Sequence, residues 1–225
     1  MQITPTNATP EDNIIHHLID NTEYLIDHPW NRSSTTFIAA SDGSVNNGNG
    51  TFGWIISTNT GLRMLQNKGR AFGYPMTSFR AEAFGICSIL IYLSTQSNAT
   101  QGFFTTLQIV CDNEALVDTI NQLLTQSRPE FPNDTLKPDW DVLQCIRNTH
   151  QQTPTVQIRW IKSHQDEDIH FKDLSLPAQL NCEADQLARE AHDLPFIEAP
   201  LRFPGNPIQV YHQSQVVTSH LKHRL

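Results

Sequence analysis

The sequence has no long apolar run and few positive charges, and each absence excludes a class of protein. Its longest apolar stretch, near residues 89–93, is far too short to span a bilayer, and residues 1–12 contain no apolar signal region. We therefore expect an intracellular protein, cytoplasmic or nuclear, that is not secreted and has no membrane partner. Lysine and arginine total 15 against 23 acidic residues, which gives a formal net charge of −8. Such a chain does not suit a simple nucleic-acid binder, whose affinity comes from cations placed on phosphates.

Cysteine is also scarce, and its four positions are widely spaced. No Cys-x-x-Cys pair occurs, so the sequence indicates neither a zinc motif nor a disulfide framework. The pattern predicts reduced thiols, with Cys87 and Cys111 in the core. The chain is rich in carboxylates instead. An enzyme that gathers carboxylates around divalent metal ions is compatible with this charge, because the bound ions cancel it locally.

The length of 225 residues suits one domain with extensions. Residues 1–36 are predicted to form an N-terminal extension, in which 11–26 has the apolar spacing of a short amphipathic helix. Residues 37–193, with 11 basic and 17 acidic side chains and a net charge of −6, are predicted to form the catalytic domain. Residues 194–225 are predicted to be a proline-containing tail or linker, strand-like at 208–211.

Apolar patterns in the central region predict an α/β fold. Three β-favouring stretches joined by short turns predict an antiparallel meander, and helices alternate with strands after it. We expect a five-stranded mixed sheet, with three antiparallel strands followed by two parallel strands and helices on both faces. The predicted strands are 37–42, 51–57, 62–72, 107–111 and 156–161, and the predicted helices are 78–93, 114–125, 139–149 (with Asp139 as its cap) and 177–192.

Two of the predicted strands end on an aspartate. Asp42 follows the first strand and precedes a turn at Gly43-Ser44, and Asp112 follows the fourth strand. Sheets of this class place their sites near the carboxyl ends of strands, so both aspartates are candidates for one site. Asp42 alone would not establish a site, because an aspartate after a strand is more often a turn former or a helix cap.

Five short motifs, taken in order, resemble those of a type 1 ribonuclease H, most closely the domain carried by reverse transcriptase polyproteins of retroelements. Each motif alone is weak, but each falls on the element where that family has it. The resemblance covers about 37–193. The motifs are Asp42-Gly43-Ser44, Arg80-Ala81-Glu82, Cys111-Asp112-Asn113, Trp160-Ile161-Lys162-Ser163-His164 and Asn181-Cys182-Glu183-Ala184-Asp185-Gln186-Leu187-Ala188.

The resemblance implies a ribonuclease H-like fold and an endonuclease that hydrolyses the RNA strand of an RNA/DNA hybrid with two metal ions. Asp42 and Asp112 would be the shared metal ligands, and Glu82 and Asp185 would complete the two shells. Physical chemistry agrees, because two carboxylates about 4 Å apart repel by about 4 kcal/mol at an effective dielectric constant near 20. Such a cluster must bind cations or hold protons. Oxygen ligands suit two Mg²⁺ ions, with Mn²⁺ as a substitute.

The resemblance also implies roles for residues outside the carboxylate set. His164 would be an auxiliary catalytic acid/base on a mobile loop, and the alternative interpretation is a solvated loop residue. The neighbouring acids 166–168 are expected to form a solvated loop face. Small polar groups and backbone can read the minor groove of a hybrid, and Arg80 could reach a phosphate. The expected substrate-binding residues are Gly43, Ser44, Thr77, Ser78, Arg80 and Asn113.

The sequence departs from the bacterial pattern of that family. The connection 128–138 is too short and too little basic to be the helical handle that grips substrate in the bacterial enzymes. Together with the net charge of −6 over 37–193, this predicts weak intrinsic affinity for the hybrid. Such affinity is normal for a monomeric domain tethered to an upstream reverse transcriptase domain.

Two other interpretations stay open. Integrases, resolvases and exonucleases also cluster carboxylates on such a sheet, although a Lys-Ser-His loop before the last aspartate favours ribonuclease H. Alternatively, the chain could be an inactive domesticated domain that binds a partner through the helix at 11–26 or the basic tail 221–225. Four intact carboxylates argue against that second interpretation.

Overall fold

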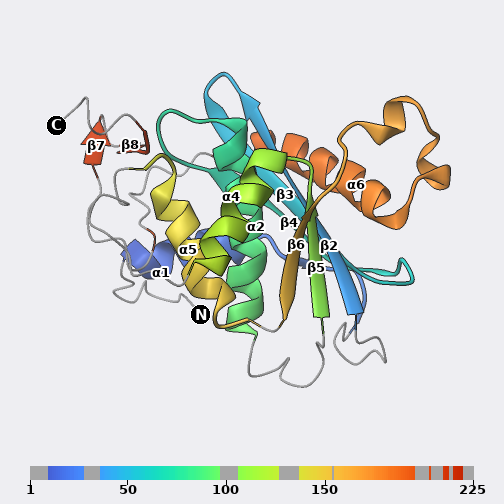
Figure 1. Cartoon of the computed structure of the whole chain (residues 1–225). Helices are drawn as coiled ribbons and strands as arrows, with labels where there is room; N and C mark the ends of the chain where they lie inside the picture. Colours follow the sequence, from blue (N-terminus) through green and yellow to red (C-terminus); the bar gives the residue numbers. More distant parts are fainter. Residues whose placement is uncertain are drawn as a thin grey trace, which may run out of the picture.

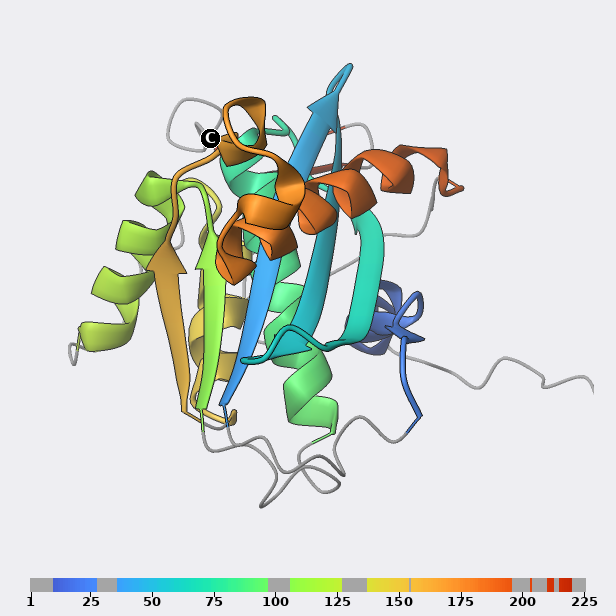
Figure 2. The same cartoon turned by 90° about the vertical axis from the view of Figure 1, so that its right-hand side faces the viewer.

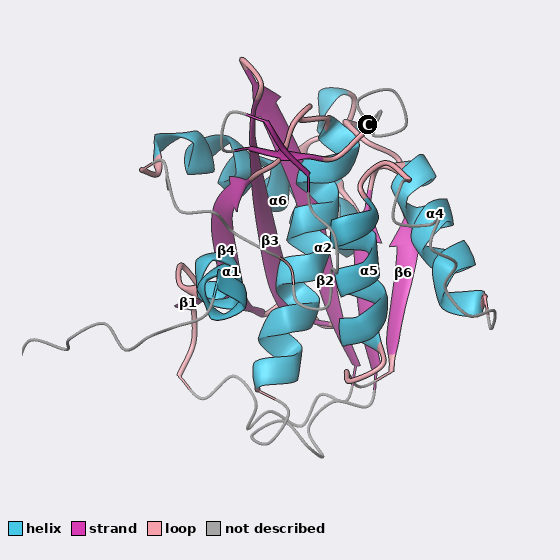
Figure 3. Cartoon of the chain, turned by 90° about the vertical axis from the view of Figure 1, so that its left-hand side faces the viewer, coloured by secondary structure: helices cyan, strands magenta, loops and turns pink. Residues whose placement is uncertain are grey.

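The computed structural model shows one mixed sheet with helices on both of its faces (Figure 1). A single helix, α6 (Leu176–Glu190), packs on β2 and β3 from one side, and Figure 2 shows it in front of the sheet. The helices α1, α2, α4 and α5 lie on the opposite face (Figure 3). The residues that the structure describes are 10–27, 36–96, 106–126, 137–153, 155–195, 203, 210–212 and 215–219.

The sheet has the strand order β1-β4-β3-β2-β5-β6. β2, β3 and β4 form the antiparallel meander, and β5 and β6 pair in parallel beside β2, as predicted. The structure adds β1, a two-residue edge strand that pairs with β4 and is too short to be read from the sequence. The strand bounds are β1 Glu23–Tyr24, β2 Thr36–Asn46, β3 Asn49–Thr58, β4 Arg63–Ala71, β5 Thr106–Cys111 and β6 Val156–Trp160, and a separate pair is formed by β7 Val210–His212 and β8 Gln215–Val217.

Helix positions follow the predicted stripes, with two differences. α1 ends at Ile19 instead of continuing to residue 26, because the chain turns there into β1. Asp139 is the residue before α5, but its carboxylate makes no capping hydrogen bond; it accepts from Arg80 instead. The other helix bounds are α1 Pro10–Ile19, α2 Ser78–Thr95, α4 Glu114–Thr125 and α5 Trp140–His150, and the short 3-10 turns are η3 Gln165–Glu167, η4 Phe171–Asp173 and η5 Ala191–Asp193.

The core draws on both flanks of the chain as well as on the central region. Ile14 and Leu18 of α1 are fully buried in the same cluster as Phe84 of α2, and so is Phe203. Phe203 stacks on Phe72 with ring centroids 5.7 Å apart. The predicted division at residues 36/37 and 193/194 stays a prediction, but these flanking side chains pack against the central core.

Part of what the sequence predicted lies outside the described residues, including 1–9, most of the connection 128–138 and the tail 221–225. Among the described helices, none is both long enough and apolar enough to cross a membrane.

Candidate functional site

The four predicted carboxylates line one open cleft of about 210 Å³ at the edge of the sheet where β5 ends. They come from four different elements: β2, α2, the turn after β5, and α6. The site predicted from the sequence is therefore brought together in space. The lining residues are Asp42, Gly43, Glu82, Asp112, His164, Asp166, Asn181, Cys182 and Asp185.

A change in strand pairing opens the sheet at Asp42. The parallel pairing of β2 with β5 stops at Ala40, whereas the antiparallel pairing with β3 continues past Asp42 to Asn46. Asp42 therefore lies within β2 and not at its end. It follows the point at which β5 stops pairing with β2. Asp112 follows β5 at the same place, so the two aspartates face a common gap.

Two glycines let the helices approach the sheet closely enough to deliver their carboxylates. A Cβ atom on Gly43 would lie 2.5 Å from the backbone nitrogen of Glu82. A Cβ atom on Gly53 would lie 2.5 Å from the carbonyl oxygen of Ala184, next to Asp185 on α6. Both distances are too short for any side chain, so glycine at these positions is what allows α2 and α6 to close on the site.

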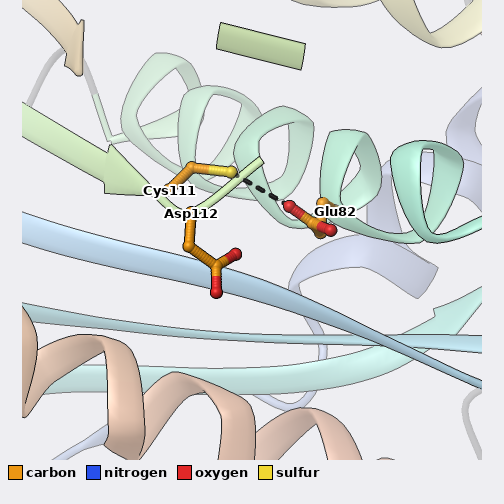
Figure 4. Close-up of side chains that lie close together, drawn as sticks. All are labelled: Glu82, Cys111 and Asp112. Carbon is orange, nitrogen blue, oxygen red and sulfur yellow. Dashed lines mark hydrogen bonds between the residues drawn. The ribbon is translucent and has the colours of Figure 1, made fainter. Parts of the chain in front are cut away.

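Glu82 is held by hydrogen bonds to both of its oxygens. Asn113 Nδ2 donates to Oε1 over 3.2 Å. The Cys111 thiol donates to Oε2, also over 3.2 Å (Figure 4). Donor atoms of Glu82, Cys111 and Asp112 all lie within 4.8 Å of one another. Burial is the main cause that raises the pKa of Glu82 to about 7, and the nearby Asp112 adds to it. The bonds from Cys111 and Asn113 oppose this shift.

Asp42 is the most perturbed carboxyl group of the cleft. Only 8% of the residue is exposed, and burial, followed by repulsion from Asp112 and Glu82, raises its pKa to about 8. The backbone N–H of Gly43 donates to Oδ1 over 2.6 Å and opposes the shift only in part. At neutral pH Asp42 therefore tends to hold a proton unless a cation neutralises it.

Asn181 is a further side chain of the cleft that the sequence analysis did not single out. Its Nδ2 donates to Asp112 Oδ2 over 3.4 Å. The residue is 7% exposed, and among the residues that the structure describes, none forms a hydrogen bond with its buried Oδ1. A buried amide oxygen without a partner is costly and is a natural ligand for a cation or a polar substrate group. The only signal in the sequence is its place one helical turn before Asp185.

Asp185 is paired with Arg189 one turn later on α6. Arg189 Nε donates to Asp185 Oδ1 over 2.9 Å, and the terminal nitrogen Nη2 contacts Oδ2. Both oxygens of the fourth carboxylate are therefore engaged by a guanidinium group on the rim of the cleft.

The loop after β6 brings His164 to the cleft. Its side chain is 70% exposed, its backbone has the left-handed φ of 51°, and its Nδ1 lies 3.8 Å from Glu167 Oε1. Asp166 was expected on a solvated loop face; it is exposed, and it also borders the cleft.

The predicted substrate-binding residues fall into distinct environments. Gly43 lines the cleft, and the hydroxyl of Ser44 lies 3.1 Å from His192 Nε2. Thr77 and Ser78 are exposed at the start of α2, where Thr77 caps the helix by accepting from a backbone N–H. These residues remain predictions, as does Asn113, which caps α4 through Oδ1 while its Nδ2 binds Glu82.

The expectation that Arg80 reaches a phosphate is wrong. Arg80 is completely buried and donates to Asp139 over 3.1 Å and to Asp141 over 2.7 Å and 2.8 Å. Its Nε donates to the carbonyl oxygen of Phe72 over 2.6 Å. Two buried carboxylates and a carbonyl group thus satisfy the guanidinium group, which ties the start of α2 to the start of α5.

Comparisons with known proteins show what the chain is similar to. A model of the reverse transcriptase-like family matches residues 40–167. Prototype foamy virus protease-reverse transcriptase is 16% identical over 76% of this chain and 22% of that chain, with a TM-score of 0.50. Ribonuclease H1 of the archaeon Halobacterium salinarum is 18% identical over 70% of this chain and 98% of that chain, with a TM-score of 0.44. LC11 ribonuclease H1 from compost, solved with an RNA/DNA hybrid, is 15% identical over 70% of this chain and 96% of that chain, with a TM-score of 0.48.

No curated protein matched the sequence. At these identities the solved structures bear on the fold alone. The predicted α/β fold of the ribonuclease H type is confirmed, with its parallel β2-β5-β6 unit and helices packed on the sheet.

Proposed function

This chain belongs to the reverse transcriptase-like family, and we propose that it is a metal-dependent endonuclease that hydrolyses the RNA strand of RNA/DNA hybrids. One observation carries the proposal: four carboxylates from four elements line one cleft, and two of them are buried. Burial without a cation raises the pKa of Asp42 to about 8 and that of Glu82 to about 7. A bound cation would offset the repulsion among these carboxylates at the edge of the sheet, and such a cluster is therefore typical of a metal site.

The donor set of the cleft fits a hard divalent cation such as Mg²⁺ or Mn²⁺. Carboxylate oxygens dominate it, and the partnerless Oδ1 of Asn181 adds a neutral oxygen donor. Oxygen-rich, incompletely enclosed sites of this kind suit ions that keep several waters and accept a phosphate oxygen. Asp42, Glu82, Asp112 and Asp185 are the residues that would hold the metal. Two bound ions would supply an activated water on one side of the phosphodiester and neutralise charge at the leaving oxygen.

The chain's own residues prepare the cleft for this reaction. Asn113 and Cys111 fix the orientation of Glu82, and Asn181 holds one oxygen of Asp112. His164, exposed on its loop at the mouth of the cleft, is placed to give or take a proton at an imidazole nitrogen, the auxiliary acid/base role.

The substrate class comes from the sequence resemblance. The backbone at Gly43 and the hydroxyl groups of Ser44, Thr77 and Ser78 are uncharged groups suited to 2′-hydroxyls in a wide minor groove. Several basic side chains near α6 are already paired with acids, which agrees with weak intrinsic affinity for phosphate. A retroelement origin, with a reverse transcriptase domain upstream holding the hybrid, would supply the missing affinity.

A strand-resolved cleavage assay tests this function. The full chain is incubated with Mn²⁺ or Mg²⁺ and a hybrid labelled differently on each strand, and separately with single-stranded RNA and duplex DNA. We expect internal cuts in the RNA strand of the hybrid and none in the DNA strand. Cutting of duplex DNA alone would contradict the proposal in favour of an integrase-like or resolvase-like nuclease. No cutting of any substrate would favour a binding module.

A further inference from the structure

Arg189 places a positive charge on Asp185, the fourth carboxylate of the cleft. Its guanidinium group contacts both oxygens of Asp185, one of them over 2.9 Å. A guanidinium group is a planar cation whose donors match the two oxygens of a carboxylate. A metal ion that binds Asp185 needs at least one of these oxygens, and like charges repel when they share a ligand.

The influence of Arg189 extends beyond Asp185. Its positive charge also reaches the buried Asp42 on β2, where it partly offsets the repulsion from the other carboxylates. Arg189 therefore acts on two of the four proposed metal ligands, Asp185 by contact and Asp42 through its charge. A divalent ion would do the same with twice the charge.

We propose that Arg189 is a built-in counter-ion of the cleft, which competes with divalent metal for Asp185 and thereby sets the metal concentration that the site requires. The inference rests on the proposed metal site. In the metal-free protein the guanidinium group stabilises Asp185 in place of the ion. On metal binding it must leave at least one carboxylate oxygen, and because its side chain is 67% exposed it can swing into solvent without disturbing the core.

An ordinary surface ion pair is the competing explanation, and another pair on the same helix supplies the matched control. Arg63 of β4 binds Glu183 of α6 at 2.5 Å, and neither residue lines the cleft. Replacing Arg63 with glutamine removes the same charge from an ion pair that involves a different carboxylate of α6. If Arg189 is only a surface pair, the two replacements will affect metal binding equally.

The test is Mn²⁺ binding to the full chain, measured by titration calorimetry without nucleic acid. Arg189→Gln is expected to lower the Kd for Mn²⁺ by about three- to tenfold at low salt, as one exposed charge next to a divalent ion would give. The gain should shrink at high ionic strength. Arg63→Gln is expected to leave the Kd almost unchanged. In an Asp185→Asn background, Arg189→Gln should have little effect, because the ligand for which the two cations compete is gone.

An unchanged or higher Kd in Arg189→Gln would overturn the inference, as would an equal gain in Arg63→Gln or a full gain in the Asp185→Asn background. Absence of Mn²⁺ binding in both the wild type and Arg189→Gln would also overturn it. Failure of the proposed function is a separate result, because it is an absence of hybrid cleavage by a wild-type protein whose Mn²⁺ binding is measured independently.

Discussion

Replacing Asp42 with asparagine is expected to stabilise the protein in the absence of metal. The same replacement is expected to abolish the nuclease activity that the protein has when metal is bound. Burial, with Asp112 and Glu82 nearby, raises the pKa of Asp42 to about 8, whereas the same carboxyl in an unfolded chain titrates near 3.8. Each unit of difference corresponds to about 1.36 kcal/mol. The aspartate therefore lowers the free energy of unfolding by as much as about 4 kcal/mol at pH 7, relative to a group that never ionises.

The sign of this effect follows from proton binding. Between about pH 4 and about pH 8 the folded protein holds a proton on Asp42 that the unfolded chain has released, so stability falls as pH rises through this window. Asparagine has no proton to lose, and its Oδ1 can still accept from the N–H of Gly43. We expect Asp42→Asn to be more stable than the wild type by about 2–4 kcal/mol near neutral pH and equally stable near pH 4.

Urea denaturation in the presence of a metal chelator measures this difference at both ends of the pH window. Asp118→Asn is the control, because it makes the same chemical change at an exposed position of α4. The reasoning is refuted if Asp42→Asn is less stable than the wild type near neutral pH, or if its gain equals that of Asp118→Asn. Added Mn²⁺ should reverse the order by stabilising only the wild type.

Three further predictions concern other parts of the site. Asp112→Asn should abolish hydrolysis of the hybrid while leaving the circular dichroism spectrum unchanged, and retained cleavage would remove Asp112 from the metal site. Arg80→Met should lower the free energy of unfolding by about 3–5 kcal/mol, because it strands the buried carboxylates of Asp139 and Asp141; a thermal melt equal to the wild type would contradict this. His164→Ala should reduce kcat by about 100-fold or more without changing Tm, since its side chain is 70% exposed; an unchanged kcat would assign it to the solvated loop.

The sequence was most informative where the spacing of apolar residues follows directly from the burial of one side of a helix or strand. Alternation predicted β6, and the apolar side of the last helix predicted α6, because both elements bury one side against the core. Asp42 and Asp112 were predictable as a pair, because both follow the paired part of neighbouring parallel strands and so lie toward the same edge of the sheet. Their convergence with Glu82 and Asp185 was inferred from the resemblance to a known family.

The sequence was least informative for side chains whose surroundings are formed by residues far away in the chain. Arg80 sits near the start of a helix, a position that is often exposed, yet it is buried by carboxylates 59 and 61 residues further along the chain. Asn181 carries no local signal of its unusual state, because its partnerless oxygen exists only once α6 has packed over Asp112. Phe203 lies in a proline-containing tail and still fills the core beside Phe72 and Phe84.

The central claim is that the carboxylates of one cleft hold divalent metal. Anomalous diffraction from crystals of the full chain soaked in Mn²⁺ tests it most directly. The account predicts density peaks within coordination distance of Asp42 and Asp112, with Glu82 and Asp185 around them, and loss of those peaks in Asp112→Asn. Peaks elsewhere on the surface with none in this cleft would contradict it.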